Sequence, residues 1–187
     1  MKKYILIAGV NGAGKSTLYY INDSLNSINR INTDEIVHTI GDWRNISDVA
    51  RAGRMAISLI NDCFSKNLSF NQETTLCGNS IFRNINKAKE LGYVIELHYV
   101  GLNSPELAKE RIRHRVEMGG HGIPDEDVDR RYVESLKNLK RAIPLADITA
   151  IYDNTVSFRR FAIFRNGKLY RLSRTVPEWF NNSGIIE

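Results

Sequence analysis

Eight residues near the N-terminus have the types and the spacing of a phosphate-binding loop. They fit the P-loop pattern G-x-x-x-x-G-K-[ST] and read Gly9-Val10-Asn11-Gly12-Ala13-Gly14-Lys15-Ser16. Glycines let a backbone turn tightly and point its N–H groups at phosphate oxygens. A lysine at this position brings a cation to the β- and γ-phosphates, and the serine hydroxyl can bind Mg²⁺. The pattern therefore predicts a site for ATP and Mg²⁺.

The residues on both sides of this loop provide the context that the pattern needs. Before it, the apolar run Tyr4-Ile5-Leu6-Ile7-Ala8 predicts a buried strand, and a helix-compatible run follows it. The alternative is a glycine-rich turn that binds nothing, but strand, loop and helix come in the required order. We expect the nucleotide to contact Gly9, Asn11, Gly12, Ala13, Gly14, Lys15, Ser16 and Thr17, with Ser16 at the metal.

Further strands and helices alternate along the chain. Strands are predicted near 28–32, 68–73, 93–100 and 148–152, with helical patterns between them. This alternation indicates an α/β fold of the P-loop NTPase or kinase type, with a parallel sheet of about five strands and helices on both faces. Asn166-Gly167 predicts a C-terminal β-hairpin over about 159–173. We interpret residues 1–187 as one domain, whose active cleft lies at the carboxyl ends of the strands.

Two acidic residues are predicted at this cleft. Asp34 follows the second strand, where a carboxylate can accept the proton of a substrate hydroxyl. It can equally be a helix cap or a first-turn acid, since a helix is predicted to begin with Thr33 or Asp34 as its cap. Glu73 ends the third strand and can contact a substrate hydroxyl or hold Mg²⁺ through water. The alternative for Glu73 is a solvated acid at a strand end.

Arginines surround a second glycine-rich segment. Arg113 and Arg115 precede Gly119-Gly120, and Arg130 and Arg131 follow it. Arginine matches phosphate oxygens with a planar fork of donors, and glycines permit a flap to move, so 111–131 is predicted to be a helical lid. The alternative is a solvated helix whose arginines pair with nearby acids.

Composition limits the class of protein and its partners. The chain has 187 residues, 42% of them hydrophobic and 25% charged, with no apolar run of membrane-spanning length. Its two cysteines form neither a metal spacing nor a disulfide framework, which favours the cytoplasm. His121 has no neighbour at ligand spacing and is interpreted as a polar loop residue. The net charge of +5 indicates an anionic partner, either nucleic acid or a phosphorylated small molecule.

Several longer motifs together resemble the zeta toxin family over about residues 3 to 155. Besides the P-loop, they are Asn-Thr-Asp-Glu-Ile (32–36), Glu-Thr-Thr-Leu (73–76), His-Arg-Val-Glu-Met-Gly-Gly-His-Gly-Ile-Pro (114–124), Asp-Val-Asp-Arg-Arg-Tyr (127–132), Ser-Leu-Lys-Asn-Leu (135–139) and Tyr-Asp-Asn (152–154). The segment at 114–124 is far more specific than the P-loop. This chain is similar to the short, compact branch of the family.

The resemblance implies a fold like that of small-molecule and nucleotide kinases. It also implies ATP-dependent phosphorylation of a sugar hydroxyl on a nucleotide sugar such as UDP-N-acetylglucosamine, and an antitoxin protein as a possible partner. By motif match, Asp34 takes the position of the general base and Lys15 that of the phosphate-binding lysine. Glu73 and Thr74 lie on the substrate side. Three lid arginines are the candidates for clamping phosphates: Arg115, Arg130 and Arg131.

Two other classes of function compete with this one. A nucleic-acid-acting P-loop protein, either a polynucleotide kinase or an ATP-dependent binding module, is favoured by the basic charge. Against it, the arginines concentrate in the lid, and no stripe of alternating aromatic and basic residues is evident. A weaker alternative is a nucleotide-binding toxin that transfers no phosphoryl group and works only through a protein partner.

Overall fold

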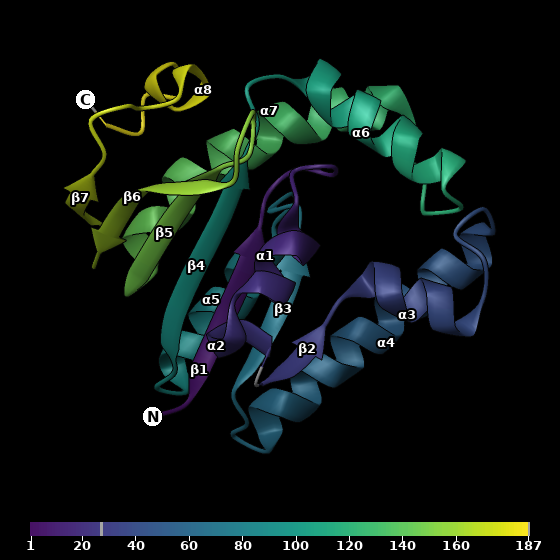
Figure 1. Cartoon of the computed structure of the whole chain (residues 1–187). Coiled ribbons are helices and arrows are strands. Elements are labelled where there is room, and N and C mark those ends of the chain that lie inside the picture. The colour runs from purple at the N-terminus through teal and green to yellow at the C-terminus, as the bar shows by residue number, and fades with distance from the viewer. Residues whose placement is uncertain (27, 187) are drawn as a thin grey trace.

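A seven-stranded sheet runs through the centre of the molecule, in the order β2-β3-β1-β4-β5-β6-β7 (Figure 1). The computed structural model describes residues 1–26 and 28–186. β1 to β5 are parallel, as predicted, and β6 and β7 extend the sheet in antiparallel fashion. The strands are β1 (Lys3–Ala8), β2 (Asn29–Ile31), β3 (Phe70–Thr74), β4 (Val94–Gly101), β5 (Ile148–Asp153), β6 (Arg159–Arg165) and β7 (Lys168–Leu172).

Helices cover both faces of this sheet, which confirms the predicted α/β class. Alternate residues of β1 enter two separate cores: Ile5 and Ile7 pack with α1 and α6, and Tyr4 and Leu6 pack with α4 and α5. Both faces are therefore buried, which explains the continuous apolar run of this strand. The helices are α1 (Lys15–Ile21), α2 (Asp23–Asn26), α3 (Thr33–Ile40), α4 (Ile46–Ser65), α5 (Ser80–Glu90), α6 (Pro105–Glu117), α7 (Asp125–Ala142) and α8 (Glu178–Asn181), with a 3-10 turn at Ile143–Leu145.

The register of the central strands brings three chain segments to one edge. Ala8, the last residue of β1, is paired with Thr74 of β3 and with Tyr99 of β4. The loop after β1 and the end of β3 therefore leave the sheet side by side. β2 lies beside β3, so α3, which follows β2, begins at the same edge.

Two helical pairs project beyond this edge and approach each other. α3 and α4 form an arm. The predicted lid, 111–131, comprises the end of α6, the start of α7 and the loop between them, and the tips of both pairs face one another in Figure 1. The cap of α3 differs from the prediction. Asn32 is the cap, and its side chain accepts a hydrogen bond from the Asp34 N–H at 3.0 Å. Thr33 and Asp34 are therefore inside the helix.

The C-terminal part contains the predicted hairpin and one helix without a sequence signal. Asn166 and Gly167 both have positive φ, as a tight hairpin turn requires, and the strands on either side of them, β6 and β7, are antiparallel partners. α8 follows, and its Trp179 and Phe180 are buried against Phe161 of β6. Among residues 1–26 and 28–186, no helix combines the length and the apolar character needed to cross a membrane.

Candidate active site

The P-loop lies between β1 and α1, in a backbone conformation that its glycines make possible. Gly9 has φ of 140°, and a Cβ there would overlap the carbonyl oxygen of Val100 in β4. Gly12 has φ of 77°, and a Cβ would come within 2.8 Å of the Ala108 carbonyl oxygen in α6. No side chain larger than hydrogen fits either position without displacement of backbone. The loop is thus packed between β4 and α6.

Lys15 is the first residue of α1 and is buried. Its ammonium donates a hydrogen bond to the Val10 carbonyl oxygen at 3.0 Å. Burial lowers the pKa of Lys15, whereas the nearby charges of Glu73 and Asp34 raise it, and the charge of Arg115 lowers it. These four charged groups therefore converge on one place, where the two cations can attract phosphate oxygens and the two carboxylates can hold a cation or accept a proton.

Ser16 and Glu73 meet beside the lysine. The Ser16 hydroxyl donates toward the two Glu73 carboxylate oxygens at 3.4 and 3.3 Å. The Glu73 side chain is 8% exposed and also accepts hydrogen bonds from Arg30 at 2.9 Å and Asn32 at 3.0 Å. The alternative of a solvated strand-end acid is therefore wrong.

Asp34 lies in the first turn of α3 and lines the same cavity as Lys15 and Ser16. Because Asn32 caps the helix, the alternative that Asp34 is the cap is excluded. A first-turn acid also interacts favourably with the helix dipole, and that role is compatible with a catalytic one.

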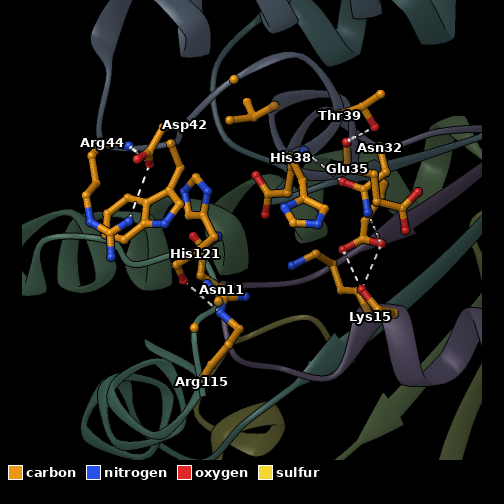
Figure 2. Close-up of a pocket in the computed structure, with 18 of the residues that line it drawn as sticks. Asn11, Lys15, Asn32, Glu35, His38, Thr39, Asp42, Arg44, Arg115 and His121 are labelled. Carbon is orange, nitrogen blue, oxygen red and sulfur yellow. Dashed lines mark hydrogen bonds and ion pairs between the residues drawn. The ribbon is translucent and has the colours of Figure 1, made fainter. Parts of the chain in front are cut away.

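One cavity of about 750 Å³ joins these groups (Figure 2). We call two of its walls the sheet side (Asn11, Lys15, Ser16, Asn32 and Glu73) and the arm side (His38, Thr39, Asp42, Trp43 and Arg44), and we call Gly119, Gly120 and His121 the lid tip. Asp34 lies in α3, the helix that leads from the sheet side to the arm side. The volume is in the range of ordinary small-molecule sites.

The lid arginines differ sharply in where they point. Arg115 lines the cavity; its Nε donates to the His121 carbonyl oxygen at 2.8 Å, and its Nη2 is buried without a hydrogen-bond partner among the described residues. Arg131 donates to the Asn11 side chain at 3.1 Å and so connects α7 to the P-loop. Both inward-facing arginines are thus close to the phosphate-binding loop.

Arg130 does not join this group. Its side chain is 59% exposed and pairs with Asp127 at 2.7 Å and with Glu134 at 3.4 Å. Arg113 is also exposed and lies 3.5 Å from Asp125. For these two residues the structure agrees with the alternative of solvated arginines paired to neighbouring acids, and it places Arg130 away from the predicted catalytic residues.

Two of the other predicted contact residues also lie outside the cavity wall. The Thr74 hydroxyl accepts a hydrogen bond from the Leu76 N–H at 3.0 Å and holds the turn after β3. Thr17 is exposed on α1. The structure thus brings together Asn11, Lys15, Ser16, Asp34, Glu73 and Arg115 around one space. The other predicted site residues do not line it: Gly9, Gly12, Ala13, Gly14, Thr17, Thr74, Arg130 and Arg131.

Sequence reasoning missed an aromatic contact across the mouth of the cavity. The rings of Trp43 and His121 lie 5.1 Å apart, so the arm contacts the lid tip. Burial lowers the pKa of His121, the Asp34 charge raises it, and the charges of Arg115 and Arg131 lower it. The only sequence signal for this contact is a single tryptophan between the two arm helices α3 and α4.

The chain matches the model of the zeta toxin family over residues 1–174. It belongs to this family. A further relative is an uncharacterized protein of Haemophilus influenzae, which is 39% identical over 131 residues, or 70% of this chain and 92% of that protein. Zeta toxin membership confirms the resemblance drawn from the motifs.

Solved structures show the same fold in other proteins. The complex of AvrRxo1-ORF1 and ORF2 with ATP gives a TM-score of 0.73 at 14% identity, over 91% of this chain. The match covers only 60% of the AvrRxo1 chain, so the present protein spans less than two thirds of that neighbour's length. The PezAT toxin–antitoxin system of Streptococcus pneumoniae gives a TM-score of 0.59 at 21% identity, over 84% of this chain and 70% of the other.

Proposed function

We propose that this protein is an ATP-dependent kinase that transfers the γ-phosphoryl group of ATP to a hydroxyl of a small molecule. One observation carries the proposal: a single cavity contains both the P-loop lysine and the carboxylate of Asp34. A phosphate-binding loop alone serves many classes of protein. A carboxylate facing the same space supplies what a hydroxyl acceptor needs, namely a group that accepts its proton.

The residues of the sheet side fit Mg-ATP. Asn11, Lys15 and Ser16 of the P-loop line the cavity, and the buried Nη2 of Arg115 has no hydrogen-bond partner among the described residues, a partner that a phosphate oxygen would supply. No group of three or more acidic, histidine or cysteine side chains among residues 1–26 and 28–186 is placed to hold a metal by itself. The metal would therefore arrive with the nucleotide, bound by Ser16 with Glu73 next to it. When bound, it neutralises charge on the phosphates.

Each remaining residue has a distinct task in this proposal. Asp34 orients the acceptor hydroxyl and takes its proton. Lys15, Arg115 and Arg131 provide positive charge for the transferring phosphoryl group. The contact between Trp43 and His121 restricts the entry of water, which competes with the acceptor for the phosphoryl group.

We propose a nucleotide sugar such as UDP-N-acetylglucosamine as the acceptor, in line with the family resemblance. The arm side supports an acceptor with both polar and aromatic parts, because it combines the indole of Trp43 with the polar side chains of His38, Thr39 and Arg44. An antitoxin partner is proposed on the same basis, since the PezAT neighbour is a toxin–antitoxin system.

The test is a phosphorylation assay with a panel of acceptors. Purified protein and Mg-ATP are incubated with nucleotide sugars, nucleosides and oligonucleotides, and mass spectrometry identifies the compound that gains a phosphoryl group. Asp34→Asn should lower turnover by about 10²- to 10⁴-fold, the usual contribution of a general base, while ATP affinity stays unchanged. Asp62→Asn, at an exposed position of α4, is the matched control and should leave turnover unaltered. Normal turnover by Asp34→Asn would remove the general base from the proposal.

A nucleic-acid acceptor is the second candidate, because the net charge is +5. The Pnkp1/Rnl/Hen1 RNA repair complex shares the fold with a TM-score of 0.59 at 17% identity, over 75% of this chain and 46% of the other. Labelling of the oligonucleotides in the panel, and of no nucleotide sugar, would favour this candidate over the first.

A further inference from the structure

Arg30 lies behind the cavity wall, and its guanidinium bridges two carboxylates. Nη2 is 2.9 Å from Glu73 Oε2, and Nη1 is 2.9 Å from Glu35 Oε1. The side chain is only 9% exposed, and the guanidinium lies 3.8 Å from the centre of the Tyr19 ring in α1. Arg30 thus connects β2, β3, α3 and the helix that follows the P-loop.

The Glu73 carboxylate is contacted from two sides. Arg30 and Asn32 both donate to Oε2 and hold it from the β2 side. The Ser16 hydroxyl approaches both carboxylate oxygens at 3.3 to 3.4 Å from the cavity side. Arg30 and Asn32 together therefore fix the orientation of the Glu73 carboxylate relative to Ser16.

We propose that Arg30 is a positioning residue for metal binding: it holds the Glu73 carboxylate turned toward Ser16, so that these two side chains form the metal-binding corner of the cavity. The inference rests on the proposed function, in which the chain binds Mg-ATP. Residues that orient metal-binding groups commonly change metal affinity by about 10- to 100-fold when they are replaced. A purely structural Arg30 would instead tie β2 to α1 without a specific effect on the metal.

Metal affinity can be measured without any acceptor, by electron paramagnetic resonance of Mn²⁺ in the presence of a non-hydrolysable ATP analogue. Arg30→Met keeps an apolar side chain of similar length against Tyr19 but removes the charge. We expect the Mn²⁺ dissociation constant to rise about tenfold, while affinity for the analogue without metal is unchanged. Arg51→Met is the matched control, since Arg51 pairs with Asp48 at 3.2 Å on the exposed part of α4 and should leave Mn²⁺ binding unaltered.

A double-mutant cycle tests whether Arg30 acts through Glu73. Glu73→Gln alone should also weaken Mn²⁺ binding. Adding Arg30→Met to Glu73→Gln should change the dissociation constant by less than about twofold, because residues in one network are not additive. Independent, multiplicative effects of the two substitutions would overturn the proposal.

Arg30→Lys keeps the inference testable if Arg30→Met does not fold. Lysine retains the positive charge but lacks the planar fork that reaches two carboxylates. We therefore expect Arg30→Lys to bind Mn²⁺ severalfold more weakly than wild type but more tightly than Arg30→Met. Wild-type Mn²⁺ affinity in Arg30→Lys, or equal loss of analogue binding with and without metal in either variant, would overturn it. Failure to find a phosphorylated acceptor would count against the proposed function alone, since this measurement needs no acceptor.

Discussion

The sheet side and the arm side of the cavity are built in different ways. On the sheet side, Asn11, Lys15 and Asn32 are between 6 and 8% exposed, and Asn11 and Asn32 have partners in distant parts of the chain, Arg131 and Glu73. On the arm side, Thr39 donates to the carbonyl oxygen of Glu35 one turn earlier, and the exposed Arg44 guanidinium lies over the ring of its neighbour Trp43; the Trp43 ring also contacts the lid tip at His121. The two walls of one cavity therefore depend on the rest of the fold to different degrees.

Because of this difference, we expect the two sides to tolerate substitutions to different degrees. A change on the sheet side disturbs the core and several strands at once, because its residues are fixed by the ends of β1 and β3. A change on the arm side affects surface residues, which usually alters stability by less than about 0.5 kcal/mol. In the proposed function, the half of the site that binds ATP is constrained by folding, and the half that selects the acceptor is free to vary.

The largest effect is expected at Arg115, where the lid meets the cavity. Arg115→Ala should lower turnover about a thousandfold, because an arginine that stabilises a transferring phosphoryl group contributes about that much to the rate. The change in stability should be much smaller. Arg130→Ala is the matched control from the same lid, because its side chain pairs with Asp127 outside the cavity. Turnover at saturating ATP measures both, and equal losses would show that position in the cavity does not decide the role of a lid arginine.

The fold and the sheet side were predictable because their signals are local. The P-loop and its flanking strand are contiguous, and the positions of Asp34 and Glu73 follow from the rule that parallel strands end at one edge. The cap at Asn32 was also within reach, since asparagine is among the preferred caps.

The other features depend on tertiary structure that no local pattern contains. Arg130 and Arg131 both pair with Asp127, but successive helical residues differ by about 100° in direction, and only Arg131 also reaches the P-loop, at Asn11. The pair of Arg30 and Glu73 requires β2 to lie beside β3. The short α8 has too few residues for a helical period, and packing of its aromatic side chains stabilises it.

A smaller effect, on stability, is expected for a glycine of the P-loop, which carries three residues of the sheet side. Gly9→Ala should lower the free energy of unfolding by roughly 2 kcal/mol, because the added methyl group overlaps the Val100 carbonyl oxygen and the backbone has positive φ. Gly53→Ala is the control in α4, where a Cβ meets nothing within 4 Å; it should leave stability unchanged or raise it by up to about 1 kcal/mol. Urea unfolding of the two variants compares them directly. Equal stabilities would contradict the tight packing of the P-loop against β4.

The smallest effect should come from the arm side, at Trp43. Trp43→Ala removes the ring that lies 5.1 Å from His121, and an aromatic contact of this kind contributes about 0.5 to 1.5 kcal/mol. We expect the KM for the acceptor to rise about three- to tenfold, with ATP affinity and the urea midpoint nearly unchanged, because the residue belongs to an exposed segment. Tyr170→Ala, which removes an exposed aromatic ring on the edge strand β7, is the control and should alter none of the three. A parallel fall in ATP affinity or stability in Trp43→Ala would show that the arm side is coupled to the sheet side, and the contrast between the two walls would then not hold.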